Sequence, residues 1–211
     1  MNLSDISLVG IKGVLLDFDN TFYDYTPAHE ASLLAVFEVF KNTHKVSYED
    51  FISLYSDAQK KVKLLTNNQA ASHSRLLYFQ KMIEHLEHTT NIQEIVILEE
   101  LYWSTFEKHM IPKKEIFDFI KKCKENGIKT CIVTDLTAGV QFRKMRAIGV
   151  DTLTDFVVTS EEAGAEKPHS AVFTLALEKL QLSPSDVIMI GDDTKKDIDG
   201  AHTHGIKAYM V

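Results

Sequence analysis

The sequence has few of the residues that hold small disulfide-rich or metal-stabilised folds together. It contains only two cysteines, Cys123 and Cys131, and their spacing matches neither a C-x-x-C motif nor a metal site. This pattern argues against a disulfide framework and favours buried, reduced thiols in a cytosolic protein. Stability must then come from a hydrophobic core, for which a chain of 211 residues with 45% hydrophobic side chains is sufficient.

Long apolar runs and an excess of positive charge are also missing. No apolar run approaches the roughly 20 residues needed to cross a bilayer, and residues 1–5 lack the features of a signal peptide. The net charge of -7 argues against a protein that holds nucleic acid with a basic patch. We therefore expect a cytoplasmic protein that binds neither nucleic acid nor a membrane, as a monomer or a homodimer.

The residue pattern predicts an α/β fold with a helical insertion. Residues 14–16 are typical of a strand buried on both faces. After residue 112, predicted helices alternate with predicted strands, and this alternation is typical of βαβ units around a parallel sheet. The predicted helices cover residues 112–126, 137–147, 170–180 and 195–202, and the predicted strands cover residues 128–133, 156–158, 187–190 and 206–211.

The segment between these two parts contains apolar residues at helical spacing and no convincing strand. We predict helices over residues 26–41, from residue 47, over residues 71–87 and from residue 90. The expected architecture is therefore a Rossmann-like doubly wound parallel sheet core with an inserted all-helical cap subdomain. The core would comprise residues 1–22 and 110–211, and the cap residues 23–109.

Polar side chains follow several of the predicted strands, where they would meet in one crevice of a doubly wound sheet. These residues are Asp17 and Asp19, Thr134 and Asp135, and Asp192 and Asp193, with Asp197 shortly after and Lys167 in the loop of residues 160–168. Each alone is also typical of an ordinary turn. Together, clustered carboxylates favour a hard divalent cation such as Mg²⁺, since the cation relieves their mutual repulsion. A carboxylate can also attack phosphorus while a neighbouring one transfers the proton.

The chain resembles the haloacid dehalogenase superfamily of hydrolases, in the subgroup with a helical cap inserted after the first motif. Residues 17–21 (Asp-Phe-Asp-Asn-Thr) are similar to the nucleophile motif of the family, and Thr134 matches its Ser/Thr motif. Residues 167–168 match the lysine motif, and residues 191–192 with Asp197 match the acidic metal motif. The four motifs occur in the family order and span nearly the whole chain.

The resemblance implies a role for each matching residue. Asp17 would be the nucleophile, and Asp19 the general acid and then the general base. The Asp17 carboxylate, the Asp19 backbone carbonyl and Asp192 would hold Mg²⁺. Asp193 and Asp197 would lie one layer further from the ion and contact its ligands. Thr134, Asp135 and Lys167 would supply the side chains of a phosphate site, which backbone amides after Asp17 and Thr134 would complete. Many relatives have Asn where this chain has Asp135, and this extra charge would disfavour some substrates unless it points away.

The resemblance implies a Mg²⁺-dependent phosphatase for a small phosphorylated metabolite such as a sugar phosphate, an acyl-sugar phosphate or a nucleotide. Two alternatives remain, a 2-haloacid dehalogenase and a regulatory protein that binds phosphate esters without turnover. Dehalogenases of the family lack the second carboxylate, which Asp19 supplies here, and a mutase remains open. Cap residues choose the substrate in this family, and the candidates are Tyr23, His29 and Arg75. Arg75 would meet a second anionic group, although a structural role, at a hinge or on a solvated helix face, is the more common one for each of these residues.

Overall fold

The computed structural model describes residues 3–67 and 69–211 and divides the chain into two compact units. The first unit comprises the chain as far as Asp24 together with Ile111–Val211, and the second comprises Tyr25–Met110. Residues 1 and 2, at the start of the segment assessed above for a signal peptide, lie outside the described residues. The first unit extends past residue 22 because Tyr23 is fully buried in it, with its ring 5.6 Å from that of Phe18.

Within the described residues, five parallel strands form one sheet in the first unit, in the order β3-β2-β1-β4-β5. The strands are β1 (Gly13–Leu16), β2 (Lys129–Thr134), β3 (Phe156–Thr159), β4 (Val187–Gly191) and β5 (Lys207–Met210). The central strand β1 pairs Leu16 with Ile132 of β2 and with Ile190 of β4. All four residues of β1 are buried, as expected for a strand covered on both faces.

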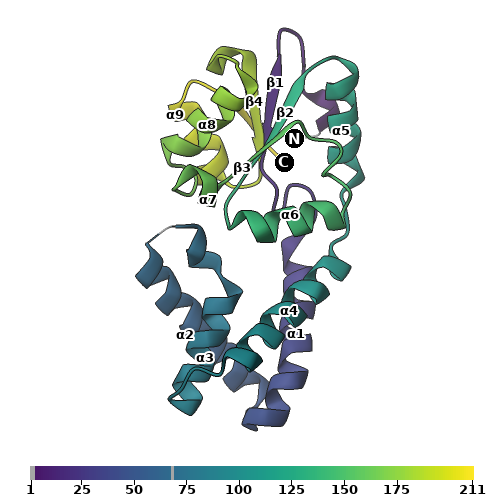
Figure 1. The fold of residues 1–211 in the computed structure, drawn as a ribbon. Coiled ribbons are helices and arrows are strands. Elements are labelled where there is room, and N and C mark those ends of the chain that lie inside the picture. The colour runs from purple at the N-terminus through teal and green to yellow at the C-terminus, as the bar shows by residue number, and fades with distance from the viewer. Residues whose placement is uncertain (1–2, 68) are drawn as a thin grey trace. The chain divides into compact units, whose positions relative to one another are not determined.

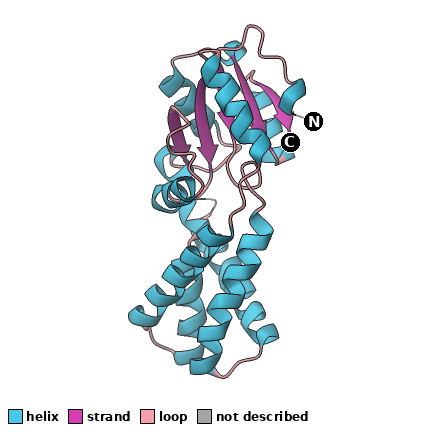
Figure 2. Ribbon diagram, turned by 90° about the vertical axis from the view of Figure 1, so that its right-hand side faces the viewer, coloured by secondary structure: helices cyan, strands magenta, loops and turns pink. Residues whose placement is uncertain are grey.

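The helices of the first unit cover both faces of this sheet. They are α5 (Lys114–Glu125), α6 (Ala138–Ala147), α7 (Ser160–Ala163), α8 (Ser170–Leu180) and α9 (Gly200–Thr203), with short segments η1 (Leu3–Asp5), η3 (Pro184–Asp186) and η4 (Thr194–Asp199). Figure 1 shows α8 and α5 on opposite sides of the sheet, and Figure 2 shows the strands lying alongside one another. This arrangement confirms the predicted doubly wound sheet.

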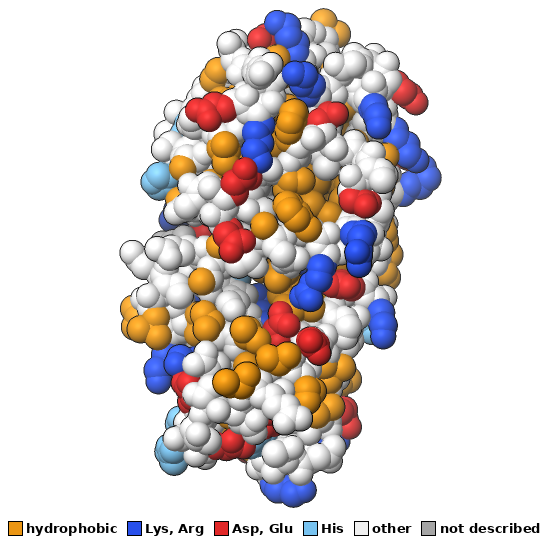
Figure 3. All heavy atoms as spheres, viewed as in Figure 1, with side chains coloured by type: hydrophobic (Ala, Val, Ile, Leu, Met, Phe, Trp, Pro, Cys, Tyr) orange, Lys and Arg blue, Asp and Glu red, His pale blue; other side chains and the backbone are white. Residues whose placement is uncertain are grey.

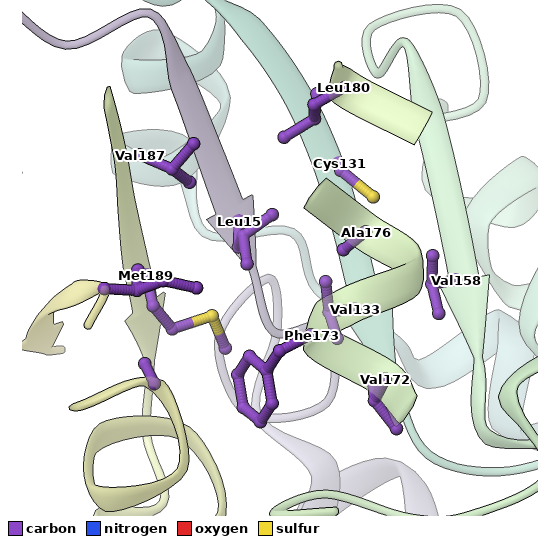
Figure 4. Packing of buried hydrophobic residues seen from close by; sticks show 12 residues of the cluster. Leu15, Cys131, Val133, Val158, Val172, Phe173, Ala176, Leu180, Val187 and Met189 are labelled. Carbon is purple, nitrogen blue, oxygen red and sulfur yellow. The ribbon is translucent and has the colours of Figure 1, made fainter. Parts of the chain in front are cut away.

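One hydrophobic core lies between the sheet and α8. Leu15 is surrounded in Figure 4 by Val133 of β2, Met189 of β4, and Phe173 and Ala176 of α8. All five side chains are fully buried. Transfer of each large apolar side chain from water contributes about 1.5–3 kcal/mol. This packing holds the strands in register, so that their carboxyl ends lie side by side. The position of those ends decides where the polar residues that follow them lie.

The second unit is helical, as predicted, and contains no strand among the described residues. Its elements are α1 (Tyr25–His44), α2 (Tyr48–Thr66), η2 (Ala70–His73), α3 (Arg75–Glu87) and α4 (Ile92–His109). Helix α1 packs along α4, and α2 along α3. Side-chain caps begin three of these helices: Ser47 accepts from the Asp50 N–H at 3.1 Å, and Ser74 and Asn91 act in the same way before α3 and α4.

Two helix predictions were wrong in detail. The helix predicted over residues 71–87 begins at Arg75, because Ser74 caps it and residues 70–73 form the 3₁₀ turn η2. The helix predicted over residues 195–202 is split into the π-helical segment η4 and α9. In η4 the Ile198 N–H donates to the carbonyl of Asp193, five residues earlier, at 3.3 Å. Such widened turns are frequent at functional sites.

Two surface properties bear on the expected partners. Among the described residues, no helix is long and apolar enough to cross a membrane. On the face drawn in Figure 3, basic and acidic side chains are interspersed. This face therefore has no broad basic patch of the kind that binds nucleic acid through its phosphates.

Candidate active site

The carboxyl ends of β1, β2 and β4 bring the predicted site residues together in the first unit. Asp17 follows β1 directly, and its N–H donates to the carbonyl of Ile190 in β4 at 2.9 Å. This bond continues the β1–β4 ladder by one residue and so fixes the backbone at Asp17. Asp17 is 6% exposed, and the Thr21 hydroxyl donates to its Oδ2 at 3.0 Å.

Lys167 connects two of the buried carboxylates. Its Nζ lies 2.5 Å from Asp17 Oδ1 and 2.7 Å from Asp197 Oδ1. Burial by itself lowers the pKa of Lys167, but Asp17, Asp197 and Asp135 together raise it above the ordinary value. The ammonium group is therefore a permanent positive charge, 150 residues away from Asp17 in the sequence but in contact with it in the fold.

Asp17, Asp192 and Asp197 each place one carboxylate oxygen within 4.8 Å of the others. Burial raises the pKa of Asp17 to about 8; Lys167 opposes this shift, whereas Asp197 and Asp19 reinforce it. Burial and the nearby Asp197 likewise raise the pKa of Asp192. Each shift records the cost of placing negative charges close together in a poorly solvated site.

Gly191 makes the approach of Asp197 possible. A Cβ at residue 191 would lie 2.6 Å from the Cβ of Asp197, closer than side chains tolerate. Both oxygens of Asp197 have partners, since Oδ1 binds Lys167 and Oδ2 accepts from the Asp193 N–H at 3.1 Å. Asp193 itself accepts from the N–H groups of Lys195 and Lys196, both at 2.9 Å, and thereby caps η4. Asp193 therefore holds the loop in place.

Asp19 lies in a separate set of hydrogen bonds. Its Oδ1 accepts from the Tyr23 hydroxyl and the Lys144 ammonium group, and its Oδ2 accepts from Gln141 Nε2 at 3.1 Å. Burial would raise the pKa of Asp19, but the charge of Lys144 and these hydrogen bonds lower it below the ordinary value. Asp19 is thus held as a carboxylate, whereas the crowded carboxylates and burial shift the pKa of Asp17 in the opposite direction.

The residues after β2 organise the opposite edge of the site. The Thr134 hydroxyl accepts from Gln141 Nε2 at 2.5 Å. The Asp135 carboxylate accepts from the Lys167 N–H at 3.0 Å and pairs with Lys196 at 2.6 Å. The additional negative charge that Asp135 brings is therefore compensated by Lys196, and its carboxylate supports the lysine loop.

Sequence reasoning missed three of these residues, Gln141, Lys144 and Lys196. The side chains of Gln141 and Lys144 are fully buried. They are three residues apart in α6, so both project from one side of that helix. A glutamine and a lysine at helix positions that usually carry apolar residues could, in principle, have indicated buried polar residues with a function. Lys196 carried no such signal, because a lysine in an acidic loop is typical of solvated surface.

Of the proposed substrate-facing residues, Tyr23 belongs to the first unit and contacts Asp19. His29 and Arg75 belong to the helical unit. His29 Nδ1 lies 2.6 Å from the Tyr102 hydroxyl. Burial and the charge of Arg75 lower the pKa of His29 to about 4. Arg75 is 4% exposed. It therefore does not lie on a solvated helix face, the alternative considered above.

Comparisons with known proteins identify the family. A family model described as "haloacid dehalogenase-like hydrolase" matches residues 11–205. The chain is 34% identical over 198 residues to the ribulose-1,5-bisphosphate 5-phosphatase of Halopiger xanaduensis, covering 93% of this chain and 83% of that protein. It is 29% identical over 205 residues to the glyceraldehyde 3-phosphate phosphatase of Methanopyrus kandleri, covering 95% and 84%.

The fold is also found among solved structures. The HAD phosphatase of Thermococcus onnurineus superimposes with a TM-score of 0.73 at 21% identity, covering 95% of this chain and 86% of that one. At this identity the likeness concerns the fold alone. The family model and the sequence relatives carry the assignment further: this chain belongs to the haloacid dehalogenase-like hydrolases, as an enzyme of the phosphatase type.

Proposed function

We propose that the protein is a Mg²⁺-dependent phosphomonoesterase that hydrolyses a small sugar phosphate. The observation that supports this most directly is the convergence of Asp17, Lys167 and Asp192, each from a different segment of the chain, at one edge of the sheet. The relatives named above act on a sugar bisphosphate and a triose phosphate. We propose further that the first unit is the catalytic core and the helical unit its cap.

The donor set suits a hard divalent cation. All three candidate ligands are carboxylates, and one oxygen of each lies within 4.8 Å of the others, so small side-chain adjustments would bring them to bonds of about 2.1 Å to one Mg²⁺ ion. We propose that Asp17 and Asp192 hold the ion together with the Asp19 backbone carbonyl. Asp197, whose two oxygens already have partners, orients Lys167 and the loop after β4. When bound, Mg²⁺ neutralises carboxylate charge and polarises the phosphoryl group.

The residues of the chain then divide the reaction between them. Asp17 attacks phosphorus, and the bond from phosphorus to the ester oxygen breaks, which leaves an aspartyl-phosphate and an alkoxide. Asp19 gives the alkoxide a proton, and in the second step it takes a proton from the water that releases phosphate. Lys167 and the Thr134 hydroxyl bind the oxygens of the transferring group.

The pKa of Asp19 is lowered in this structure, yet the first step needs its protonated form. A phosphate ester beside Asp19 brings negative charge, which raises the pKa of that carboxyl. Substrate binding therefore supplies the shift that the general acid requires. Lys144 and Tyr23 retain the carboxylate in position throughout.

The test is phosphate release from a panel of phosphomonoesters with Mg²⁺, including glyceraldehyde 3-phosphate, ribose 5-phosphate and p-nitrophenyl phosphate. Asp17→Asn should reduce turnover by roughly 10⁴-fold or more, as removal of a nucleophile does. Asp118→Asn is the matched control, because this exposed aspartate in the same unit pairs with Lys114 in a surface ion pair. Full activity of Asp17→Asn would contradict the assignment.

Two further measurements, of halide release and of ligand binding, distinguish the alternatives. Halide release from 2-haloacids without added metal would support a dehalogenase, and binding of phosphate esters without turnover would support a regulatory protein. The presence of both Asp19 and Asp192 at the site favours phosphate-ester hydrolysis over both.

A further inference from the structure

Gln141 of α6 joins three groups of the candidate active site through one amide nitrogen. Its Nε2 lies 2.5 Å from the Thr134 hydroxyl oxygen, 2.7 Å from the Asp135 carbonyl oxygen and 3.1 Å from Asp19 Oδ2. The side chain is fully buried, and all four residues belong to the first unit. An amide nitrogen has two hydrogens, so the three oxygens share two N–H groups, and the shortest contact is the one to Thr134.

The partners of Gln141 fix which end of its amide group faces them. A carbonyl oxygen and an ionised carboxylate only accept hydrogen bonds, so the nitrogen must face Asp135 and Asp19. Among the described residues, none donates a hydrogen bond to the other end of the amide, Oε1, which is buried. A buried acceptor without a partner is costly, and a methionine of similar size would avoid this cost. The fold therefore gains little from a glutamine here beyond its three contacts.

The contact with Gln141 determines where the hydrogen of the Thr134 hydroxyl points. Because Nε2 can only donate, the Thr134 oxygen accepts from it and the hydroxyl hydrogen must point elsewhere. The hydroxyl donates to the Asp135 carbonyl over 3.2 Å, a long bond between two oxygens. An anionic oxygen is a stronger acceptor than a carbonyl. A phosphoryl group that binds beside Thr134 would therefore take this hydrogen from the carbonyl.

The same amide group lowers the cost of this exchange. When the Thr134 hydroxyl turns away, the Asp135 carbonyl loses one donor, but Gln141 Nε2 still donates to it at 2.7 Å. The carbonyl is therefore not left without a partner, which would be costly. Donation from Gln141 to the Thr134 oxygen also polarises the hydroxyl and strengthens the hydrogen bond that the hydroxyl donates.

We propose that Gln141 is a positioning residue that keeps the Thr134 hydroxyl a donor towards the transferring phosphoryl group. The contact of Gln141 with Thr134 is the shortest of the three and that with Asp19 the longest. Its main effect therefore passes through Thr134, whereas Lys144 acts on Asp19. This inference rests on the proposed phosphatase activity and adds to it a residue outside the four motifs.

The experiment replaces the amide donor by a group that cannot donate and by one that accepts. Gln141→Met removes both N–H groups and should lower kcat/KM by about tenfold, the upper range for one hydrogen bond. Gln141→Glu keeps the shape but introduces a carboxylate that takes the Thr134 hydrogen and repels phosphate, so we expect a loss of about 10²–10³-fold. Gln93→Met and Gln93→Glu are the matched controls, because Gln93 is an exposed glutamine within α4. Both should stay within about twofold of wild type.

Two measurements separate positioning from a purely structural role. Thr134→Val removes the hydroxyl, so adding Gln141→Met to it should cost less than about twofold, because effects that pass through one contact are not additive. The loss in Gln141→Met alone should be equal for p-nitrophenyl phosphate and ribose 5-phosphate, since both present the same phosphoryl group. Losses that multiply in the double variant, or a loss clearly larger for ribose 5-phosphate, would overturn the proposal.

Thermal melting establishes whether the variants are folded. Gln141→Met should melt no lower than wild type, because it also removes the unpartnered Oε1. If Gln141→Met does not fold, Gln141→Glu decides the question, since its side chain has nearly the same shape as that of glutamine. Its loss should be at least about threefold smaller in the Thr134→Val background. An equal loss in both backgrounds would contradict a role through Thr134.

The outcomes separate this inference from the phosphatase proposal. An unchanged kcat/KM in Gln141→Met would overturn the positioning role while leaving the phosphatase proposal intact. Absence of phosphate release from every substrate would overturn the phosphatase proposal itself. Titration calorimetry with inorganic phosphate and Mg²⁺ then tests Gln141 separately, because the Kd of Gln141→Met should be about tenfold higher than that of wild type. Equal Kd values, or no phosphate binding by wild type, would overturn the positioning role.

Discussion

Lys144 donates a hydrogen bond to Asp19 from 125 residues further along the chain, and its side chain is fully buried. The same ammonium group lies 5.3 Å from the ring centre of Phe18 and 5.6 Å from that of Tyr23. These contacts hold the lysine beside Asp19 and stabilise the ionised carboxylate. Lys144 is therefore a positioning residue for the proposed acid–base group.

Lys144→Met should reduce kcat by about 10- to 100-fold, the usual contribution of a well-placed general acid–base group being 10²–10⁴. The loss should be smaller for p-nitrophenyl phosphate than for a sugar phosphate, because p-nitrophenolate leaves without a proton. Steady-state kinetics with both substrates measures this. Arg146→Met, an exposed cation on the same helix, is the control, and an equal loss for both substrates would contradict a role through Asp19.

Mg²⁺ should raise the melting temperature of the protein, because it binds the folded carboxylate cluster and relieves its repulsion. At 100 times Kd the stabilisation is about 2.7 kcal/mol, which corresponds to roughly 5–10 °C for a chain of this size. Thermal melts with Mg²⁺ and with EDTA measure the shift. Asp192→Asn should lose most of it, whereas Asp118→Asn should retain it. An equal shift in all three proteins would show that the ion binds elsewhere.

Asp135→Asn should be tolerated, with kcat/KM within about threefold of wild type, whereas Asp135→Ala should lower it by about tenfold. An asparagine still offers an acceptor to the Lys167 N–H, but alanine leaves that N–H without the partner that it has at 3.0 Å. Kinetics of the two variants side by side provides the test. Equal losses in both would mean that the charge opposite Lys196 matters more than the hydrogen bond to the lysine loop.

Stability should fall in acid through His29, whose pKa is lowered to about 4 by burial and by Arg75. The unfolded chain takes up this proton near pH 6.5, so the contribution of neutral His29 is complete above that pH. It is lost as the pH falls towards 4, up to a bound of about 3 kcal/mol. Urea unfolding of wild type and of His29→Gln between pH 4 and 7.5 measures this contribution. The difference between their free energies of unfolding isolates His29, because the other groups titrate in both proteins. A difference that does not vary with pH would contradict this prediction.

Gly191→Ala should disturb the carboxylate cluster, because an added methyl group would overlap the side chain of Asp197. We expect a loss of about 1–3 kcal/mol, typical of overpacking, together with weaker Mg²⁺ stabilisation. Gly139→Ala is the control, since a Cβ at Gly139 meets no atom within 4 Å. Wild-type stability of Gly191→Ala would contradict the close approach of Asp197.

The order of the elements could be predicted from sequence because it depends on local chemistry. Apolar residues 14–16, followed at once by Asp17 and Asp19, identify a buried strand with a polar end, and the later strands repeat this pattern. Parallel strands place such ends along one edge of a sheet. The fold class and the identity of the main strand-end residues followed from these patterns alone.

The sequence by itself determined which carboxylates could converge, but only the tertiary structure decided which cations accompany them. Lys196 resembles an ordinary surface charge when read along the chain. The sequence likewise does not show that Lys144 and Arg75 are buried, because burial and partners depend on distant segments. Folding places Lys144 beside Asp19, pairs Lys196 with Asp135 and buries Arg75 among aromatic rings. Local spacing predicts what a helix or strand presents, whereas desolvation and pairing depend on what packs against it.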